Sequence, residues 1–322
     1  MPSITQSFEE ILHDRLKENE PMSKHTNFRI GGSVRWFVEI KIVEELTQII
    51  QIAKTNHLSY FVLGGGSNML VSDEGFDGIC LKMAMRAITI NDNRVRAEAG
   101  VLSVALARAT AKAGLAGFTW AISLPGTIGG AVRGNAGCFG GETKDHLVSA
   151  EVFRDGEVMS LSKSDLHFGY RESSIKHSND IVLSATFEFE QGDSVILEQD
   201  LVQKLSSRKS SQPLDAGSAG CLFKNYEASE EVLQRLKQKL DIPSEMSSTR
   251  RISAGWLIDQ LDLKGKQIGG AKISEKHGNF VVNIREATAD EVMQLIALIK
   301  TRARNEFGIQ LEEEVQLIIS SK

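Results

Sequence analysis

The sequence has few cysteines, no excess of basic residues and no long apolar run. Its 322 residues include three cysteines, Cys80, Cys138 and Cys221, an odd set without the CxxC spacing of zinc sites. Such a set is typical of reduced thiols in the cytosol. We therefore expect neither a structural disulfide nor a metal site.

Charge and hydropathy exclude further classes of protein. The 37 basic residues face 42 acidic ones, for a net charge of -5, so nothing offsets the phosphates of a nucleic acid and we expect no such partner. No run approaches the roughly 18 apolar residues of a membrane span. Met1 to Asn19 carries Glu9, Glu10 and Asp14 among its apolar residues, unlike a signal peptide. We predict an amphipathic helix there, no membrane partner and a cytoplasmic location.

The composition, 41% hydrophobic and 25% charged, is that of a folded globular protein. A chain of 322 residues exceeds what one hydrophobic core usually organises, so two or three domains are expected. The polar stretch Ser206 to Gly217 is rich in Ser, Gly and Pro, and we predict a linker there.

Local patterns predict several elements. Periodicity and turn residues indicate both strands and helices. Two hairpins are expected around Asn91-Asp92-Asn93 and Asp155-Gly156, and Thr288 and Glu291 form a capping box at the start of a helix. The other predicted elements are strands at Ser33 to Ile40, Tyr60 to Leu63, Asp180 to Glu190 and Ile309 to Ile319, and helices at Glu44 to Thr55 and Val101 to Lys112, the latter ended by Gly114.

The segment LGGGSNML, Leu63 to Leu70, places three glycines after a short apolar run. Its bare amides, with Ser67 and Asn68, suit a diphosphate. It is not a Rossmann fingerprint, because the third glycine would fall on Met69, and no Gly-Lys-Ser/Thr of a P-loop follows. A glycine-rich turn without a ligand is the alternative.

A second segment, SLPGTIGGAVRGNAGCFGGE from Ser123 to Glu142, holds seven glycines. Each weakens a helix or strand by about 0.5–1 kcal/mol relative to Ala, so their number favours close backbone approach to a flat or charged ligand. Two such segments in one chain favour a dinucleotide cofactor.

Ordered motifs along nearly the whole chain resemble one enzyme family. They are HTNFRIGG (His25 to Gly32), GGGSN, LPGTIGGAVRGNAG, FGYRESS, AGCLFKN, AGWLID, KHGNFVVN and LEEEV. The chain is similar to the UDP-N-acetylenolpyruvoylglucosamine reductases (UDP-N-acetylmuramate dehydrogenases) of peptidoglycan synthesis. The resemblance implies an α+β fold: a two-lobed FAD-binding domain of the vanillyl-alcohol oxidase (PCMH) type, with lobes at 1–83 and 84–208, and a C-terminal α+β substrate-binding domain at 212–322.

The resemblance also implies the chemistry. A monomeric enzyme with noncovalent FAD would use NADPH to reduce UDP-N-acetylglucosamine enolpyruvate to UDP-N-acetylmuramate. Another noncovalent-FAD oxidoreductase of this fold and a non-catalytic nucleotide-sugar-binding relative are the alternatives. The residues implied to hold FAD are Gly64, Gly65, Gly66, Ser67, Asn68, Pro125, Gly126, Thr127, Gly129, Gly130, Asn135 and Gly137.

Three residues match the family's catalytic positions. Reduction of the enolpyruvyl double bond places negative charge beside the substrate carboxylate, so the site needs a cation and a proton donor. Arg171 of FGYRESS matches the cation, Cys221 of AGCLFKN stands where the family usually has the donor serine, and Glu314 of LEEEV matches the glutamate that assists protonation. The alternatives are a surface arginine, a buried small hydrophobe and a solvated strand edge.

Several assignments stay open. In an alternating strand Glu312 and Glu314 share a face, so spacing does not choose between them, and Ser218 is a second candidate donor. The insertion Tyr226 to Ser253 predicts an extra helix, Ala228 to Leu240, of unknown role. No tyrosine lies between Arg171 and Asn225, which indicates the family type without a tyrosine loop. The implied substrate-binding residues are Tyr170, Lys224, Asn225, His277 and Asn279; a structural role is equally open for His277 and is expected for His25.

Overall fold

The computed structural model describes residues 3–319 and divides into two compact units, each described by itself. The first unit contains the residues through Glu20, Val34–Gly66 and Asp77–Ser210. The second contains Pro21–Ser33, Ser67–Phe76 and the residues from Ser211 on. Two short segments from the expected range 1–83 therefore group with the C-terminal residues.

The first unit begins with a four-stranded sheet of order β1-β2-β5-β3. Its strands are β1 Leu16–Pro21, β2 Ser33–Ile40, β5 Phe76–Met83 and β3 Tyr60–Leu63. In β2 the residues Val34, Trp36 and Val38 are buried on one face, and Phe37 is also buried on the other face, where Arg35 is exposed. The predicted strands at Ser33 to Ile40 and Tyr60 to Leu63 are confirmed.

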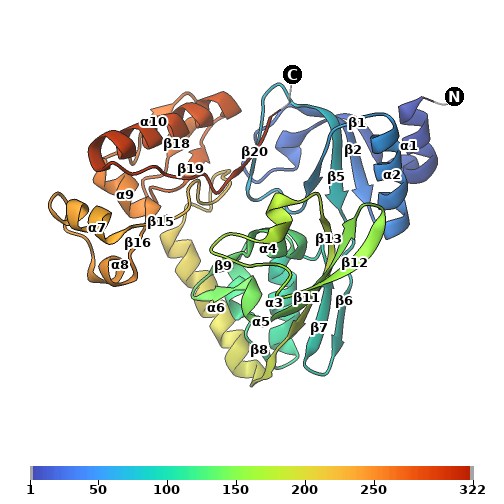
Figure 1. Ribbon diagram of the computed structural model, residues 1–322, viewed down its shortest axis with the longest axis horizontal. Helices are drawn as coiled ribbons and strands as arrows, with labels where there is room; N and C mark the ends of the chain where they lie inside the picture. The colour runs from blue at the N-terminus through green and yellow to red at the C-terminus, as the bar shows by residue number, and fades with distance from the viewer. Residues whose placement is uncertain (1–2, 320–322) are drawn as a thin grey trace. The chain divides into compact units, whose positions relative to one another are not determined.

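A five-stranded antiparallel sheet of order β12-β11-β13-β7-β6 follows in the same unit (Figure 1). Both predicted hairpins are confirmed: Asp92 has φ 54°, and Asp155 and Gly156 have φ 52° and 100°, the left-handed backbone that tight turns need. The strands are β6 Ile88–Asn91, β7 Arg94–Glu98, β11 Leu147–Arg154, β12 Glu157–Ser162 and β13 Ile181–Glu188, with short pairs β8 Leu115–Ala116 with β14 Glu190–Gln191 and β9 Gly137–Cys138 with β10 Gly141–Glu142.

Helices complete the first unit around one continuous core, which includes Trp36, Phe118 and Phe187. The predicted helix that Gly114 ends is confirmed, with Gly114 at φ +70°. The helices are α1 Ile4–Leu12, α2 Val43–Thr55, α3 Ser103–Lys112, α4 Ile128–Gly134, α5 Thr143–His146 and α6 Ser194–Ser211, with 3-10 turns η1 His13–Arg15, η3 Thr119–Ser123 and η4 Ser174–His177.

The second unit is a smaller α+β unit with its own core, which includes Phe28, Phe223 and Leu295. The capping box predicted at Thr288 and Glu291 is confirmed at the start of its longest helix. Its elements are helices α7 Glu230–Lys237, α8 Ser244–Thr249, α9 Ala254–Gln260 and α10 Ala289–Phe307, the turn η2 Met22–Lys24, the sheet β17 Gln267–Ile268, β18 Ala271–Ile273 and β19 Val281–Asn283, and the pairs β4 Met69–Val71 with β20 Gln316–Ile318 and β15 Tyr226–Glu227 with β16 Arg251–Ile252.

The insertion Tyr226 to Ser253 is closed at its base by β15 and β16 and carries α7 and α8. Its helix is shorter than the predicted Ala228 to Leu240. Arg235 Nη2 donates to the carbonyl of Phe307 at 3.3 Å, and Lys239 Nζ donates to the carbonyl of Glu306 at 2.9 Å. These cations satisfy carbonyls at the C-terminal end of α10, where positive charge is favoured.

Two sequence predictions are wrong. The helix predicted from Met1 to Asn19 ends at Leu12, because His13 adopts φ 53° and the chain then pairs as β1; Met1 and Pro2 lie outside the described residues. The linker predicted from Ser206 to Gly217 is helical through Ser211, although the boundary between the units falls within it. Polar composition alone does not distinguish an exposed helix from a linker.

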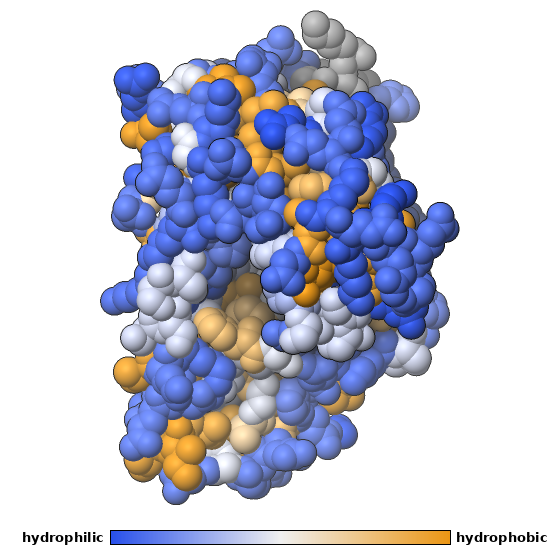
Figure 2. Space-filling view, turned by 90° about the vertical axis from the view of Figure 1, so that its left-hand side faces the viewer, coloured by the Kyte–Doolittle hydropathy of each residue, from blue (hydrophilic) through white to orange (hydrophobic). Residues whose placement is uncertain are grey.

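None of the helices within residues 3–319 has the length and apolar character to cross a membrane. The three cysteines lie in the described part of the chain and form no disulfide. Figure 2 shows a face on which hydrophilic side chains predominate, with small hydrophobic areas between them.

Candidate active site

The two glycine-rich segments meet in the first unit. A Cβ atom on Gly64 would lie 2.5 Å from Thr127 Oγ1, and one on Gly65 would lie 2.5 Å from the Cα of Gly126. Gly126 itself has φ +111°. Only glycine permits this backbone approach, so the two segments form a single cradle, defined here as Gly64–Gly66 with Gly126–Thr127.

Two buried hydroxyls at this cradle have no hydrogen-bond partner among the described residues. Thr127 Oγ1 is one, on a side chain 4% exposed, and Ser103 Oγ is the other. Buried polar groups are nearly always hydrogen-bonded, so an orphaned hydroxyl in a glycine cradle fits a polar ligand group. Lys82 Nζ donates to the carbonyl of Gly64, and burial lowers the pKa of Lys82.

Asn135 follows α4 with a left-handed backbone at φ 41° and is fully buried. Its Nδ2 donates to Glu142 Oε2 at 3.0 Å and to the carbonyl of Gly169 at 2.8 Å, while its Oδ1 accepts from the amide of Lys144 at 3.1 Å. These contacts commit the Asn135 side chain to the protein itself. Its geometry favours a structural task over a direct cofactor contact.

Arg171 lies next to the same segment. Its Nη2 donates to the carbonyl of Gly137 at 2.7 Å, and its Cζ lies 5.2 Å from the ring centroid of Tyr170. The structure thus joins the predicted arginine to the end of the second glycine-rich segment. Sequence distance had separated them by more than 30 residues.

The loop that carries Cys221 belongs to the second unit and is held by Asn279. Asn279, 2% exposed, accepts from the amide of Phe223 through Oδ1 at 3.0 Å and donates from Nδ2 to the carbonyl of Phe223 at 2.8 Å. The amide of Leu222 donates to the Asn279 carbonyl at 2.9 Å. Asn279, predicted to bind substrate, therefore fixes the backbone next to Cys221.

Glu314 is placed beside the same loop. Its amide donates to the carbonyl of Leu222 at 2.7 Å, and its carbonyl accepts from Asn68 Nδ2 at 3.0 Å. The structure therefore brings three sequence-predicted residues, Asn68, Cys221 and Glu314, into one region of the second unit.

The strand predicted from Ile309 to Ile319 is wrong in extent, because only Gln316–Ile318 is a strand. The alternation that made Glu312 and Glu314 equivalent does not apply. Glu313 pairs with Lys300 on α10 at 2.7 Å, and Glu312, 73% exposed, lies 3.5 Å from Lys224. Each of the two preceding glutamates therefore lies beside a lysine, and the assignment of Glu314 as the functional acid stays a prediction.

The remaining predicted substrate residues lie around this loop. Asn225 Oδ1 accepts from the amide of Ala254 at 3.2 Å, at the start of α9. Burial, and secondarily the charge of Lys264, lowers the pKa of His277, whose Nδ1 accepts from the amide of Asn279 at 3.3 Å. A His277 that stays neutral and buttresses Asn279 fits the structural alternative. Ser218 Oγ accepts from the amide of Gly220 at 3.1 Å.

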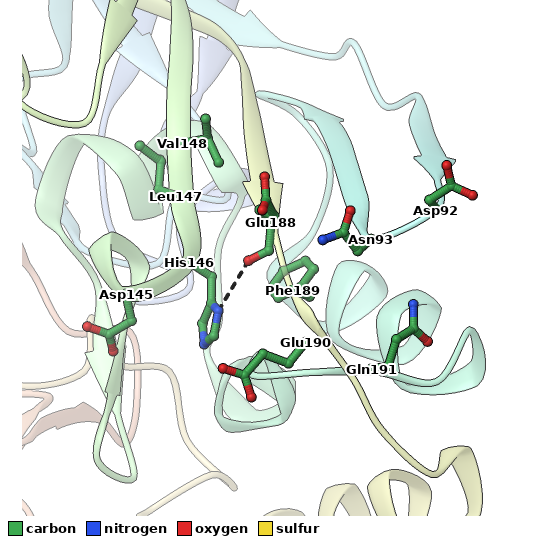
Figure 3. Close-up of a pocket in the computed structure, with 10 residues that line it drawn as sticks. All are labelled: Asp92, Asn93, Asp145, His146, Leu147, Val148, Glu188, Phe189, Glu190 and Gln191. Carbon is green, nitrogen blue, oxygen red and sulfur yellow. Dashed lines mark hydrogen bonds between the residues drawn. The ribbon is translucent and has the colours of Figure 1, made fainter.

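A surface pocket of about 830 Å³ in the first unit contains none of the predicted residues (Figure 3). His146 Nδ1 lies 3.3 Å from the carbonyl oxygen of Glu188 there, and Asp92, Asp145, Glu188 and Glu190 are among the residues that line the pocket. The candidate site is assigned elsewhere in spite of the size of this pocket, because the glycine cradle and the predicted catalytic residues do not line it. Residues 3–319 hold no group of three or more His, Cys, Asp or Glu side chains placed to bind a metal ion.

Three residues at the site were not predicted from the sequence. Lys82 Nζ donates to the carbonyl of Gly64, the Ser103 amide donates to the carbonyl of Gly126 at 3.1 Å, and Lys176 Nζ donates to the carbonyl of Arg171. Lys176 lies five residues after Arg171, so its closeness to the motif FGYRESS is a signal that the sequence contains. Lys82 and Ser103 had no local signal, because only tertiary packing brings them to the glycine segments.

Comparison with known proteins gives the family. Residues 34–162 match the FAD binding domain family, and residues 212–318 match the UDP-N-acetylenolpyruvoylglucosamine reductase C-terminal domain family. The predicted fold class, an FAD-binding domain followed by an α+β C-terminal domain, is confirmed.

Relatives align over nearly the full chain. The UDP-N-acetylenolpyruvoylglucosamine reductase of Clostridium botulinum (strain Eklund 17B / Type B) is 36% identical over 94% of this chain and 93% of its own. That of Bacillus pumilus (strain SAFR-032) is 33% identical over 99% of each. The crystal structure of the Thermus caldophilus enzyme matches with a TM-score of 0.75 and 31% identity, over 95% of this chain and 99% of its own. This chain belongs to the UDP-N-acetylenolpyruvoylglucosamine reductase family.

Proposed function

We propose that this chain reduces UDP-N-acetylglucosamine enolpyruvate to UDP-N-acetylmuramate, with FAD as resident cofactor and NADPH as reductant, in peptidoglycan precursor synthesis. The reaction adds two electrons and one proton from NADPH, and a second proton from an acid, across one carbon–carbon double bond. The carrying observation is the family match over nearly the full chain, together with the glycine cradle and the bond of Arg171 to Gly137 in the second glycine-rich segment.

The cradle of the first unit fits FAD. Gly64 and Gly65 leave no room for a Cβ, Gly126 has a φ of +111° that favours glycine, and Thr127 Oγ1 is a buried donor in need of an acceptor. When bound, FAD takes two electrons from NADPH and passes them to the substrate. The residues proposed to hold it are Gly64, Gly65, Gly66, Ser67, Asn68, Pro125, Gly126, Thr127, Gly129, Gly130 and Gly137, with Asn135 supporting them from within the protein.

Arg171 stabilises the charge that develops beside the substrate carboxylate. A guanidinium is always ionised and presents a planar fork that matches a carboxylate. Its Nη2 is oriented by the Gly137 carbonyl at 2.7 Å, and Tyr170 lies beside it. A fixed cation of this kind costs no reorganisation when the charge appears.

Cys221 supplies the proton and Glu314 assists it. A thiol with an ordinary pKa of about 8.5 is largely protonated at neutral pH and is a stronger acid than a serine hydroxyl. The backbone of Glu314 is bonded to Leu222, the residue after Cys221, which supports a shared task. Lys224 and Asn225, in the same loop, are proposed to contact the nucleotide sugar, with His277 and Asn279 supporting them.

The two parts of the chain divide these tasks. The regions 1–83 and 84–208 supply the cofactor lobes and 212–322 supplies the substrate domain, apart from the short segments that group with it. The protein acts as a monomer in the cytoplasm, where nucleotide sugars and NADPH are available to it.

An anaerobic titration tests the proposal. Purified protein is expected to be yellow, to bleach with NADPH and to regain its colour with UDP-N-acetylglucosamine enolpyruvate. A colourless protein with no affinity for FAD overturns the proposal. Reoxidation that requires oxygen and releases peroxide indicates an oxidase instead, and nucleotide-sugar binding without reoxidation indicates a non-catalytic relative.

A further inference from the structure

The backbone of Arg171 adopts an uncommon conformation. Its φ is 56°, in the left-handed region that side chains with a Cβ rarely occupy. Such a conformation persists only where surrounding contacts impose it, and non-glycine residues of this kind concentrate at functional sites. Contacts that impose this conformation therefore also set where the Arg171 guanidinium points.

The turn around Arg171 is closed at both ends and anchored from outside. The amide of Gly169 donates to the carbonyl of Glu172 at 3.0 Å, and the amide of Glu172 returns a bond to Gly169 at 3.3 Å. Asn135 Nδ2 donates to the same Gly169 carbonyl at 2.8 Å. Glu142, which accepts from Asn135 Nδ2 at 3.0 Å, fixes the orientation of that amide.

A second anchor comes from Lys176 in η4. Its Nζ donates to the carbonyl of Arg171 and lies 3.6 Å from Glu172 Oε1, with the side chain 19% exposed. A cation is a strong donor to a carbonyl, and here the carbonyl belongs to the left-handed residue itself. Loss of this bond would free the peptide after Arg171 to rotate into a commoner conformation.

We propose that Asn135 and Lys176 are positioning residues that hold the Arg171 guanidinium where negative charge develops on the substrate. This inference rests on the proposed function. Asn135 fixes the start of the turn through Gly169, and Lys176 fixes the carbonyl of Arg171. The arginine then needs little further ordering, because its backbone and the Nη2 contact of its side chain with Gly137 are already set.

The test compares Lys176→Met with Lys176→Arg and with Lys163→Met, an exposed lysine that serves as matched control. Each protein is reduced anaerobically by NADPH and then mixed with UDP-N-acetylglucosamine enolpyruvate in a stopped-flow instrument. Lys176→Met is expected to slow reoxidation by roughly 10–100-fold, the usual consequence of a small misplacement, while reduction by NADPH stays within about twofold. Lys176→Arg is expected to recover most of the loss.

A second readout does not depend on turnover. In FAD-free protein, the Nε–Hε NMR signal of Arg171, assigned through Arg171→Lys, is expected to be sharp in the parent and broadened in Lys176→Met. Asn135→Gly, which keeps the left-handed backbone without strain but removes the amide, is expected to broaden it as well.

The inference is overturned if Lys176→Met keeps the parental reoxidation rate and Arg171 signal, or if both half-reactions slow equally. A parent protein that the enolpyruvyl substrate fails to reoxidise overturns the proposed function instead. In that case the NMR comparison still decides whether Lys176 and Asn135 order Arg171.

Discussion

In the first unit, Gly64 and Gly65 approach Thr127 and Gly126 so closely that no side chain fits, whereas in the second unit the buried amide of Asn279 holds the loop next to Cys221. The first arrangement depends on the absence of side-chain atoms, and the second depends on hydrogen bonds made by a side chain. Added atoms should therefore damage the first region, and removed atoms the second. This contrast also distinguishes the cofactor cradle from the groups proposed to handle the proton.

The largest effect is expected at Cys221. Cys221→Ala should slow reoxidation of the NADPH-reduced protein by the enolpyruvyl substrate roughly 10²–10⁴-fold, because a positioned proton donor contributes about that much. FAD affinity should be unchanged, as measured by fluorescence titration of apoprotein. Cys221→Ser, which restores a donor, should stay close to the parent. If both variants match the parent, Cys221 is not the donor and Ser218 becomes the candidate.

Removing the Asn279 amide should lower the free energy of unfolding of the second unit by about 2–6 kcal/mol. Asn279→Ala leaves both backbone groups of the buried Phe223 without their partner, at about 1–3 kcal/mol each. Urea unfolding measures the change, with the exposed Asn305→Ala as control. A loss below about 0.5 kcal/mol would show that water replaces the amide.

Adding one methyl group at Gly65 should destabilise the first unit by about 1–3 kcal/mol, the usual cost of overpacking, and should weaken FAD binding by displacing Gly126. The Cβ of Gly65→Ala would meet the Cα of Gly126, a backbone atom that cannot swing aside. Gly134→Ala is the matched control, since nothing lies within 4 Å of a Cβ there. Equal FAD affinities in the two variants, measured by titration of apoprotein, would remove the steric argument for the cradle.

The two units should lose stability at different pH values when the solution is acidified. Burial holds the pKa of His277 below its ordinary value of 6.5, so the unfolded chain binds that proton first. Its contribution to stability is present above pH 6.5 and is lost as the pH falls toward the folded pKa. In the first unit, Arg15 lowers the pKa of Glu45 below 4.5, and that contribution is lost only as the pH falls through the depressed pKa.

Amide hydrogen exchange, measured at a series of decreasing pH values, shows which unit loses protection first. Amides of α9 and β19, close to His277, are expected to lose protection at higher pH than those of α2, which carries Glu45. His277→Gln should remove the early loss without moving the later one. Simultaneous loss in both units would contradict this assignment.

The local sequence was enough to predict elements whose defining contacts join neighbouring residues. The hairpins at Asp92 and at Asp155-Gly156, and the capping box at Thr288, depend on neighbouring residues and are confirmed. Two of the predictions that failed concern segments whose partners are distant. The chain after Leu12 becomes β1 in a sheet, and Ile309 to Ile319 is held mostly by bonds to Leu222 and Asn68 instead of a regular strand.

The sequence by itself determined the family, the two glycine segments and the catalytic candidates, because residue type and order within each motif carry that information. Only the tertiary structure decided that the glycine segments touch, that Asn279 holds the Cys221 loop and that Asn135 and Lys176 reach the turn of Arg171. Those contacts join residues far apart or turned by an unusual backbone angle. Packing between distant segments determines these contacts, and no local sequence pattern predicts them.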